Sequence, residues 1–318
     1  MLNRKVAITG GTGMMGTILA DSLRNRGDEV FIIGRGASKG PRQIRWNPKR
    51  GIEGASVLDG LDTVFHLAGA PIADRPWTQS RRKVLRESRV DSAITLQREL
   101  AKLSRPPKTY IGVGSLGLFG DCGEQIVDDD ATHGDGFLAE LSRDWEDAHF
   151  GARSLGCRVA VLRMSIVLSP TGGAFPLMVK PFRLGIGGWL GNGKQYTSWI
   201  SVRDAVAALI FLMDNENATG GFNGTAPESC RNKLWFKALG RVLNRPVLTH
   251  APKWALRGAL GDLADELFLA SIRPVPRKLL QAGFKFQDHD IEQTFQWLIS
   301  ELDNNGPLMR LQPTTRRR

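Results

Sequence analysis

Short apolar runs alternate with amphipathic stretches along the first half of the chain. Residues 5–9 form the first run, and a glycine-rich loop follows. Apolar side chains then recur at helical spacing until Gly27, at Met15, Ile18, Leu19 and Leu23. Similar runs at 30–33, 64–67, 109–113 and 158–163 predict further strands, with helices over about 78–104 and 136–155. The alternation predicts an α/β fold, a doubly wound parallel sheet with helices on both faces.

The regular alternation ends after residue 163. Residues 169–200 are rich in glycine, proline and aromatic residues, and helices are expected near 203–214, 230–243, 253–270 and 288–303. Ser201-Val-Arg-Asp204 resembles a capping box at the start of the first of these helices. We therefore predict a sheet-forming domain at 1–165 and a smaller, mainly helical C-terminal part at 166–318. Part of the latter should return to the sheet and cover its carboxyl edge, where ligands of such sheets bind.

Composition favours a soluble globular protein. The 318 residues are 42% hydrophobic and 24% charged, and the chain has no long apolar run, which argues against disorder and a membrane span. The first strand begins so close to Met1 that no signal peptide is expected, so we predict a cytoplasmic protein. Its three cysteines have no metal-ligand spacing, so we expect reduced thiols and no metal site.

The formal net charge of +11 would suit an anionic partner. Part of the excess lies in the terminal Arg316-Arg317-Arg318 and in scattered positions such as Arg81, Arg82 and Lys83, where a solvated surface is the simpler interpretation. No RNA-binding motif and no basic stripe interleaved with aromatic residues is present, so nucleic-acid binding is not expected.

The glycine loop carries the clearest functional signal. Gly10, Gly13 and Gly16 have the Gly-x-x-Gly-x-x-Gly spacing, which allows a tight turn, close approach of the backbone to a diphosphate, and close packing of helix on strand. The loop follows an apolar strand and opens an amphipathic helix. This context favours dinucleotide binding over a purely structural turn.

The end of the second strand points to the type of dinucleotide. An acidic residue is expected there when the ligand is NAD, but this chain has Gly34-Arg35-Gly36. Arg35, with Lys39 or Arg42, could pair with a 2′-phosphate, so NADP(H) is the predicted cofactor. The alternative is that Arg35 is an ordinary exposed arginine.

Several segments together resemble the atypical short-chain dehydrogenase/reductases of the "epimerase family protein" group. They are Thr9-Gly-Gly-Thr-Gly-Met-Met-Gly16, His66-Leu-Ala-Gly-Ala-Pro-Ile72, Phe137-Leu-Ala-Glu-Leu-Ser-Arg-Asp-Trp-Glu146, Leu162-Arg-Met-Ser-Ile-Val-Leu-Ser-Pro170 and Asn223-Gly-Thr-Ala-Pro227. The resemblance implies an extended Rossmann fold of about seven parallel strands, with residues 1–165 as the NADP-binding domain and a substrate pocket against the C-terminal part. By motif, it places Thr12, Met14, Met15, Arg35, Leu67, Ala68 and Gly69 along the cofactor. It brings Val113, Gly114, Met164 and Ser165 close to the nicotinamide.

The usual catalytic pair of these enzymes is missing. A short-chain dehydrogenase normally uses a Tyr for proton transfer and a Lys four residues later that lowers the pKa of that Tyr. The only tyrosines are Tyr110 and Tyr196, and neither is followed by a Lys at that spacing. Leu138 and Ser142 occupy the two positions when the helix is aligned by its trailing Glu146.

The glycine-rich strand end at 112–120 also departs from the resembled group. Gly114 stands where a serine is usual, and Leu118-Phe119 stand where tyrosines are usual. Ser115 is a weak catalytic candidate, because side chains alternate faces along a strand and a turn hydroxyl is the simpler interpretation. His66 and Asp121 are better explained by packing and by a turn.

The segment 185–199 should cross the mouth of the substrate pocket. We therefore expect substrate contacts from Phe119, Gln195, Tyr196, Trp199 and Arg203, although Trp189 and Trp199 could equally be packing anchors. Two functions remain open, an NADP(H)-dependent oxidoreductase or epimerase acting on a small oxygenated substrate and a non-catalytic NADP(H) sensor. A monomer or homodimer is expected.

Overall fold

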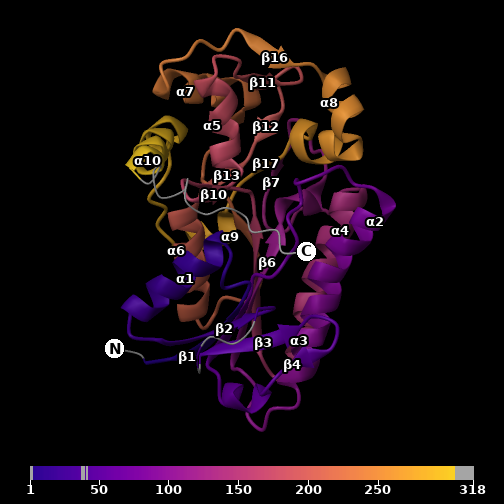
Figure 1. The fold of residues 1–318 in the computed structure, drawn as a ribbon, viewed down its shortest axis with the longest axis vertical. Coiled ribbons are helices and arrows are strands. Elements are labelled where there is room, and N and C mark those ends of the chain that lie inside the picture. Colours follow the sequence, from indigo (N-terminus) through magenta and orange to yellow (C-terminus); the bar gives the residue numbers. More distant parts are fainter. Residues whose placement is uncertain (1–2, 37–39, 41, 305–318) are drawn as a thin grey trace.

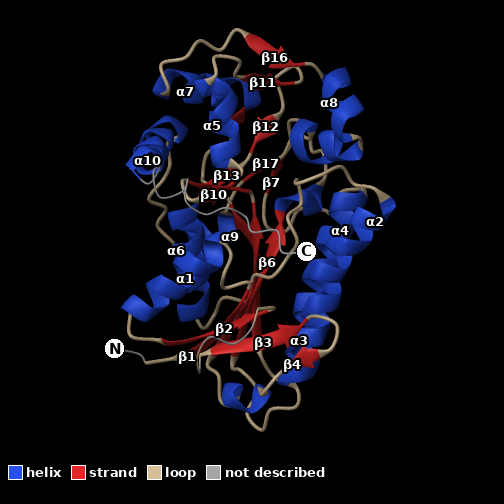
Figure 2. Ribbon diagram, viewed as in Figure 1, coloured by secondary structure: helices blue, strands red, loops and turns tan. Residues whose placement is uncertain are grey.

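The computed structural model describes residues 3–36, 40 and 42–304, and an eight-stranded sheet organises its lower half as drawn in Figures 1 and 2. The strand order is β14-β8-β6-β5-β1-β2-β3-β4. The first seven are mutually parallel, and β4 pairs antiparallel with β3 at the edge. Their bounds are β1 Lys5–Thr9, β2 Glu29–Gly34, β3 Gln43–Asn47, β4 Gly51–Ile52, β5 Thr63–His66, β6 Thr109–Ser115, β8 Arg158–Met164 and β14 Gly220–Gly224. The predicted α/β class with about seven parallel strands is confirmed.

Helices cover both faces of this sheet. Helix α1 (Met14–Asn25) packs beside α6 (Val202–Asp214) on one face, and α3 (Ser92–Leu100) packs beside α4 (Phe137–Phe150) on the other (Figure 1). Alternate residues of each strand serve the two layers, since Ile32 packs in the α1 layer and Ile33 in the α3 layer. Burial on both faces explains why the strands read as continuous apolar runs.

The chain returns to the sheet after residue 165, because α6 and β14 both come from beyond it. One half of the capping box predicted for α6 is present, with the Ser201 hydroxyl accepting a hydrogen bond from the backbone N–H of Asp204 at 3.1 Å. The Asp204 carboxylate accepts from the N–H groups of Gln287 and Asp288, both at 2.9 Å. These contacts join α6 to the C-terminal part and account for both polar residues without chemistry.

The smaller part lies beyond the carboxyl ends of the strands and combines helices with short strand pairs (Figures 1 and 2). Stacked and edge-on aromatic rings form its core, among them Phe175, Trp235 and Phe295. The helices of this part are α5 Phe175–Arg183, α7 Asn232–Val242, α8 Lys253–Leu260 and α10 Ile291–Asn304, whereas α9 Arg277–Gln281 packs against β14 of the main sheet. The strands are β7 Ile126–Val127, β9 Ile166–Ser169, β10 Gly172–Gly173, β11 Gly188–Leu190, β12 Tyr196–Thr197, β13 Trp199–Ser201, β15 Cys230–Arg231, β16 Thr249–Ala251 and β17 Arg273–Pro274.

Two predicted helices are interrupted, and β3 and α5 are among the elements that were missed. The helix expected over 78–104 is α2 (Gln79–Arg86) joined to α3 by a π-helical turn, Glu87–Asp91. The helix expected over 253–270 ends with α8, because Gly261 adopts a positive φ of 60°, and a π-helical turn, Ala264–Leu269, follows. Strand β3 has only two buried residues, Ile44 and Trp46, and α5 carries a proline in its first turn and another near its end, so neither gave a clear pattern.

Candidate cofactor and active site

The carboxyl ends of the parallel strands bring the predicted cofactor residues to one edge. Strand β1 ends at Thr9 beside His66 of β5, and β6 ends with Ser115 beside Met164 of β8. The helices that follow β1 and β5 cover opposite faces of the sheet, which is the topological switch point where dinucleotides bind. The residues placed at this edge are Leu67, Ala68, Gly69, Val113, Gly114, Met164 and Ser165.

The three glycines of the loop are each fixed by close backbone contacts. Gly10 has φ 69°, and the N–H of Gly13 donates to its carbonyl at 3.0 Å. A Cβ on Gly16 would lie 2.3 Å from that same carbonyl oxygen, so no larger side chain fits. Gly13 caps α1 with no side-chain hydrogen bond, which leaves the N–H groups of the first turn available to an anion. The loop therefore has the shape that a diphosphate requires.

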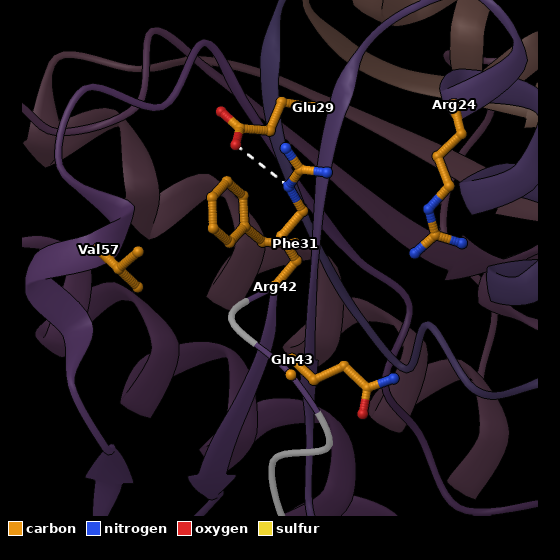
Figure 3. Close-up of a pocket in the computed structure, with 7 residues that line it drawn as sticks. Arg24, Glu29, Phe31, Arg42, Gln43 and Val57 are labelled. Carbon is orange, nitrogen blue, oxygen red and sulfur yellow. Dashed lines mark hydrogen bonds and ion pairs between the residues drawn. The ribbon is translucent and has the colours of Figure 1, made fainter.

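Arg35 follows β2 directly and is exposed at the same edge. Its two predicted helpers fare differently. Lys39 lies outside the described residues. Arg42 points toward the amino end of β2, where its Nε donates to Glu29 Oε1 at 3.2 Å beside a surface hollow of about 530 Å³ (Figure 3). Arg42 therefore lies toward the amino end of β2, away from the carboxyl edge, and pairing it with a 2′-phosphate is not supported.

Arg89 is a cation at this edge that sequence analysis missed. It lies on the π-helical turn, with Cζ 5.0 Å from the centre of the Trp145 ring and 3.5 Å from where a Cβ of Gly69 would stand. It has no ion pair among the described residues, and its closest acceptors are the Leu85 carbonyl at 3.4 Å and the Ser88 hydroxyl at 3.5 Å. Burial lowers the pKa of its guanidinium to about 10. The sequence signal that could have revealed Arg89 is its place four residues after the buried Leu85, on a helical segment where an apolar residue would be expected.

Histidines beneath the edge are structural. His66 lies between Thr9 and Ser92, with Nδ1 2.7 Å from the Thr9 hydroxyl and Nε2 3.2 Å from the Ser92 hydroxyl. It is fully buried, and desolvation lowers its pKa well below the ordinary value, so it stays neutral. His149 of α4 likewise donates from Nε2 to the Val113 carbonyl at 3.0 Å. Packing, rather than acid–base chemistry, accounts for His66.

The two positions aligned with the usual Tyr and Lys cannot move a proton. Leu138 is apolar and packs on Gly117, where an added Cβ would lie 2.6 Å from its side chain. The hydroxyl of Ser142 is buried and donates to the Leu138 carbonyl at 2.6 Å. Ser115 accepts a hydrogen bond from the N–H of Gly117 at 3.0 Å, which caps the 3₁₀ turn Leu116–Phe119. This contact agrees with the simpler interpretation of Ser115, a hydroxyl that caps a turn.

The five residues expected to contact substrate all have protein partners. Phe119 and Trp199 are almost fully buried, which favours the packing alternative for Trp199. Gln195 donates to the carbonyls of Leu190 and Phe268, at 3.1 and 3.2 Å. Tyr196 lies against the guanidinium groups of Arg231 and Arg273, and Arg203 pairs with Asp288 while stacking on Trp297. Their substrate role stays a prediction.

A cavity of about 300 Å³ lies instead between Gly117, the start of α4 and the α8 region. Leu138 forms part of its wall, so it adjoins the position of the usual catalytic tyrosine. Charged side chains line much of the remainder, namely Asp121, Asp135, Lys253, Arg257, Asp265 and Glu266. Glu266 also accepts a hydrogen bond from the N–H of Leu138 at 2.6 Å, which caps α4 from the C-terminal part.

Within the described residues, no group of histidine, cysteine and acidic side chains could hold a metal ion. No helix in that part of the chain is both long and apolar enough to cross a membrane.

Comparison with known proteins gives matches over nearly the whole chain. Residues 6–223 match the NAD dependent epimerase/dehydratase family, and residues 251–298 match a domain of unknown function, DUF1731. An epimerase family protein of Mycobacterium bovis is 37% identical over 291 residues, which cover 92% of this chain and 96% of that protein. The epimerase family protein SDR39U1 of Bos taurus is 34% identical over 302 residues, covering 93% and 100%.

Solved structures of similar proteins match the fold of this chain. The crystal structure of human epimerase family protein SDR39U1 with NADPH superposes with a TM-score of 0.84 at 28% identity, covering 93% of this chain and 99% of that one. A nucleoside-diphosphate sugar epimerase from Corynebacterium glutamicum gives a TM-score of 0.74 at 27% identity, covering 96% and 66%.

Proposed function

The chain belongs to the NAD dependent epimerase/dehydratase family, and on that premise we propose that it is an NADP(H)-dependent oxidoreductase or epimerase acting on a small oxygenated substrate. The observation that carries the proposal is the N-terminus of α1, which follows the loop of Gly10, Gly13 and Gly16. No side chain caps this helix, so its first N–H groups are free to bind a phosphate. The NADPH bound to the human relative supports the same cofactor here.

Different residues at the strand ends would bind different groups of the cofactor. The N–H groups of the α1 first turn, at Met14 and Met15, would bind the diphosphate, with Arg89 as a nearby positive charge. Arg35 would pair with the 2′-phosphate. When bound, the nicotinamide would supply or accept a hydride. The contacts expected from the chain along the rest of the cofactor are those of Thr12, Leu67, Ala68, Gly69, Val113, Gly114, Met164 and Ser165.

Proton transfer must take a route other than the usual one. Neither Leu138 nor Ser142 offers a titratable proton, because the first is apolar and the second is bonded to a backbone carbonyl. Ser115 and water are the candidate donors that we consider at this strand end, and the cavity beside Leu138, with its charged lining, is the space we assign to the substrate. The hydroxyl of Ser115 would have to leave its bond to Gly117 to take part.

The same two residues favour a second candidate function. A chain that binds NADPH but has no proton relay on α4 is suited to sensing the cofactor and regulating a partner. Sensor and enzyme make the same binding prediction and differ only in turnover.

The test has two stages. Binding of NADPH is first measured by calorimetry, and absence of binding would overturn both candidate functions. Oxidation of NADPH is then followed with a panel of aldehydes, ketones and nucleotide sugars. Turnover with any compound above the rate of the Gly16→Val variant supports the enzyme, and its absence across the panel favours the sensor.

A further inference from the structure

Strand β3 places a second arginine beside the end of β2. In the parallel register of the two strands, Ile33 lies opposite Ile44 and Gly34 lies opposite Arg45. Opposed residues of parallel strands point to the same face of the sheet. Arg45 therefore stands level with Gly34, one residue before Arg35, at the carboxyl edge.

The face that Arg45 shares with Gly34 is the face of the glycine loop. Ile33 and Ile44 pack in the α3 layer, so Gly34 and Arg45 must point the other way. Ile32, two residues earlier on that same face, lies under the loop, since a Cβ on Gly11 would approach its Cδ1 to 2.6 Å. A Cβ on Gly34 would meet no atom within 4 Å. The space directly beside Gly34 on this face is therefore open.

We propose that Arg45 is a second arginine for the 2′-phosphate of NADPH and helps to set the preference for NADPH over NADH. The inference rests on the proposed cofactor site and adds a specificity residue to it. Arg35 at the end of β2 and Arg45 on β3 flank the open space beside Gly34. An arginine offers paired N–H donors that match a phosphate group.

Little holds Arg45 in its present contact. Its side chain is 57% exposed, and its single ion pair among the described residues joins Nη1 to Glu53 Oε1 at 3.6 Å, with Glu53 67% exposed. Pairs of this kind contribute little to stability, so exchange for a phosphate costs little. Arg42 is the natural comparison, because it is an exposed arginine three residues away that points to Glu29 at the opposite end of β2.

The experiment measures dissociation constants of NADPH, NADH and adenosine 2′,5′-bisphosphate for the wild type, Arg45→Gln and Arg42→Gln. Loss of a charge-assisted contact in Arg45→Gln should weaken binding of NADPH and of the bisphosphate about tenfold, with NADH unchanged. Arg42→Gln should bind all three as the wild type does. Arg45→Lys, which keeps the charge and loses the paired donors, should fall between the two.

The outcomes separate this inference from the proposed function. A wild type that prefers NADPH, with Arg45→Gln keeping the full preference, overturns the role of Arg45 alone. A wild type that binds neither dinucleotide, or binds both equally, overturns the NADP(H) assignment and the inference with it. Equal weakening of NADPH and NADH in Arg45→Gln also overturns it, since that pattern reports a general disturbance of the site. Unchanged unfolding temperatures of the variants confirm that binding, and not folding, was altered.

Discussion

Substituting alanine for glycine should have opposite effects in two helices of this protein. In α1, a Cβ on Gly16 would lie 2.3 Å from the Gly10 carbonyl oxygen and 2.6 Å from Gly11 Cα, both backbone atoms. In α8, a Cβ on Gly258 would meet nothing within 4 Å, and the residue is exposed. The two changes are chemically identical, so the difference between them isolates the close approach at the glycine loop.

The expected sizes follow from these contacts. Gly258→Ala should stabilise the fold by about 0.5–1 kcal/mol, because alanine loses less backbone entropy than glycine in a helix. Gly16→Ala should destabilise it by about 1–3 kcal/mol despite the same helix preference, because backbone must shift to admit the methyl group. The shift displaces the first turn of α1 from the loop, so NADPH affinity should also fall at least about tenfold, or about 1.4 kcal/mol.

Urea unfolding with and without NADPH measures both effects. Gly258→Ala should keep the stabilisation by NADPH that the wild type shows, and Gly16→Ala should lose most of it. A Gly16→Ala protein that is as stable as the wild type and binds NADPH equally would refute the reasoning, since the loop would then not require the contact seen here.

Three further predictions concern groups that hold the site in place. His149 and His66 are both buried and neutral, and the pKa of His149 is lowered to about 4, so the unfolded state binds protons first as the pH falls below 6.5. His149 alone accounts for about 2 kcal/mol between pH 7.5 and 5 and His66 adds to it, so urea unfolding should show a loss of more than about 2 kcal/mol; no loss would contradict the burial argument. Glu266→Ala should cost about 0.5–2 kcal/mol by uncapping α4, whereas exposed Glu140→Ala should change stability little, as thermal unfolding would show. Arg163→Met should cost about 3–5 kcal/mol in the same assay by leaving the buried Glu146 carboxylate unpaired, and restoring stability with Glu146→Gln is the check.

Much of the sheet could be predicted because its strands are buried on both faces. Apolar runs at 5–9 and 109–113 needed no partner information to be recognised, and the glycine spacing fixed where the first helix begins. Strand β3 was missed because its buried and exposed residues alternate over only five positions. Its register with β2 depends on tertiary structure and could not be predicted from the sequence. That register is what separates the positions of Arg42 and Arg45.

The candidate site was predictable where local geometry decides it and not where packing does. The tight loop of Gly10, Gly13 and Gly16 could be predicted from their spacing together with the apolar strand before it and the amphipathic helix after it. The partners of Gln195, Trp199 and Arg203 come from segments far along the chain, so their burial could not be read from the sequence. Arg89 was missed for a different reason. It stands out because no carboxylate among the described residues pairs with its guanidinium, and the lack of a partner cannot be seen in the sequence.

We propose that the glycine loop and the end of β2 hold NADPH. The most direct measurement is the unfolding temperature of the purified protein with NADPH and with NADH at equal concentrations. We expect a clear rise with NADPH and little with NADH, since stabilisation depends on the ratio of ligand concentration to Kd. No rise with either dinucleotide, or an equal rise with both, would contradict it.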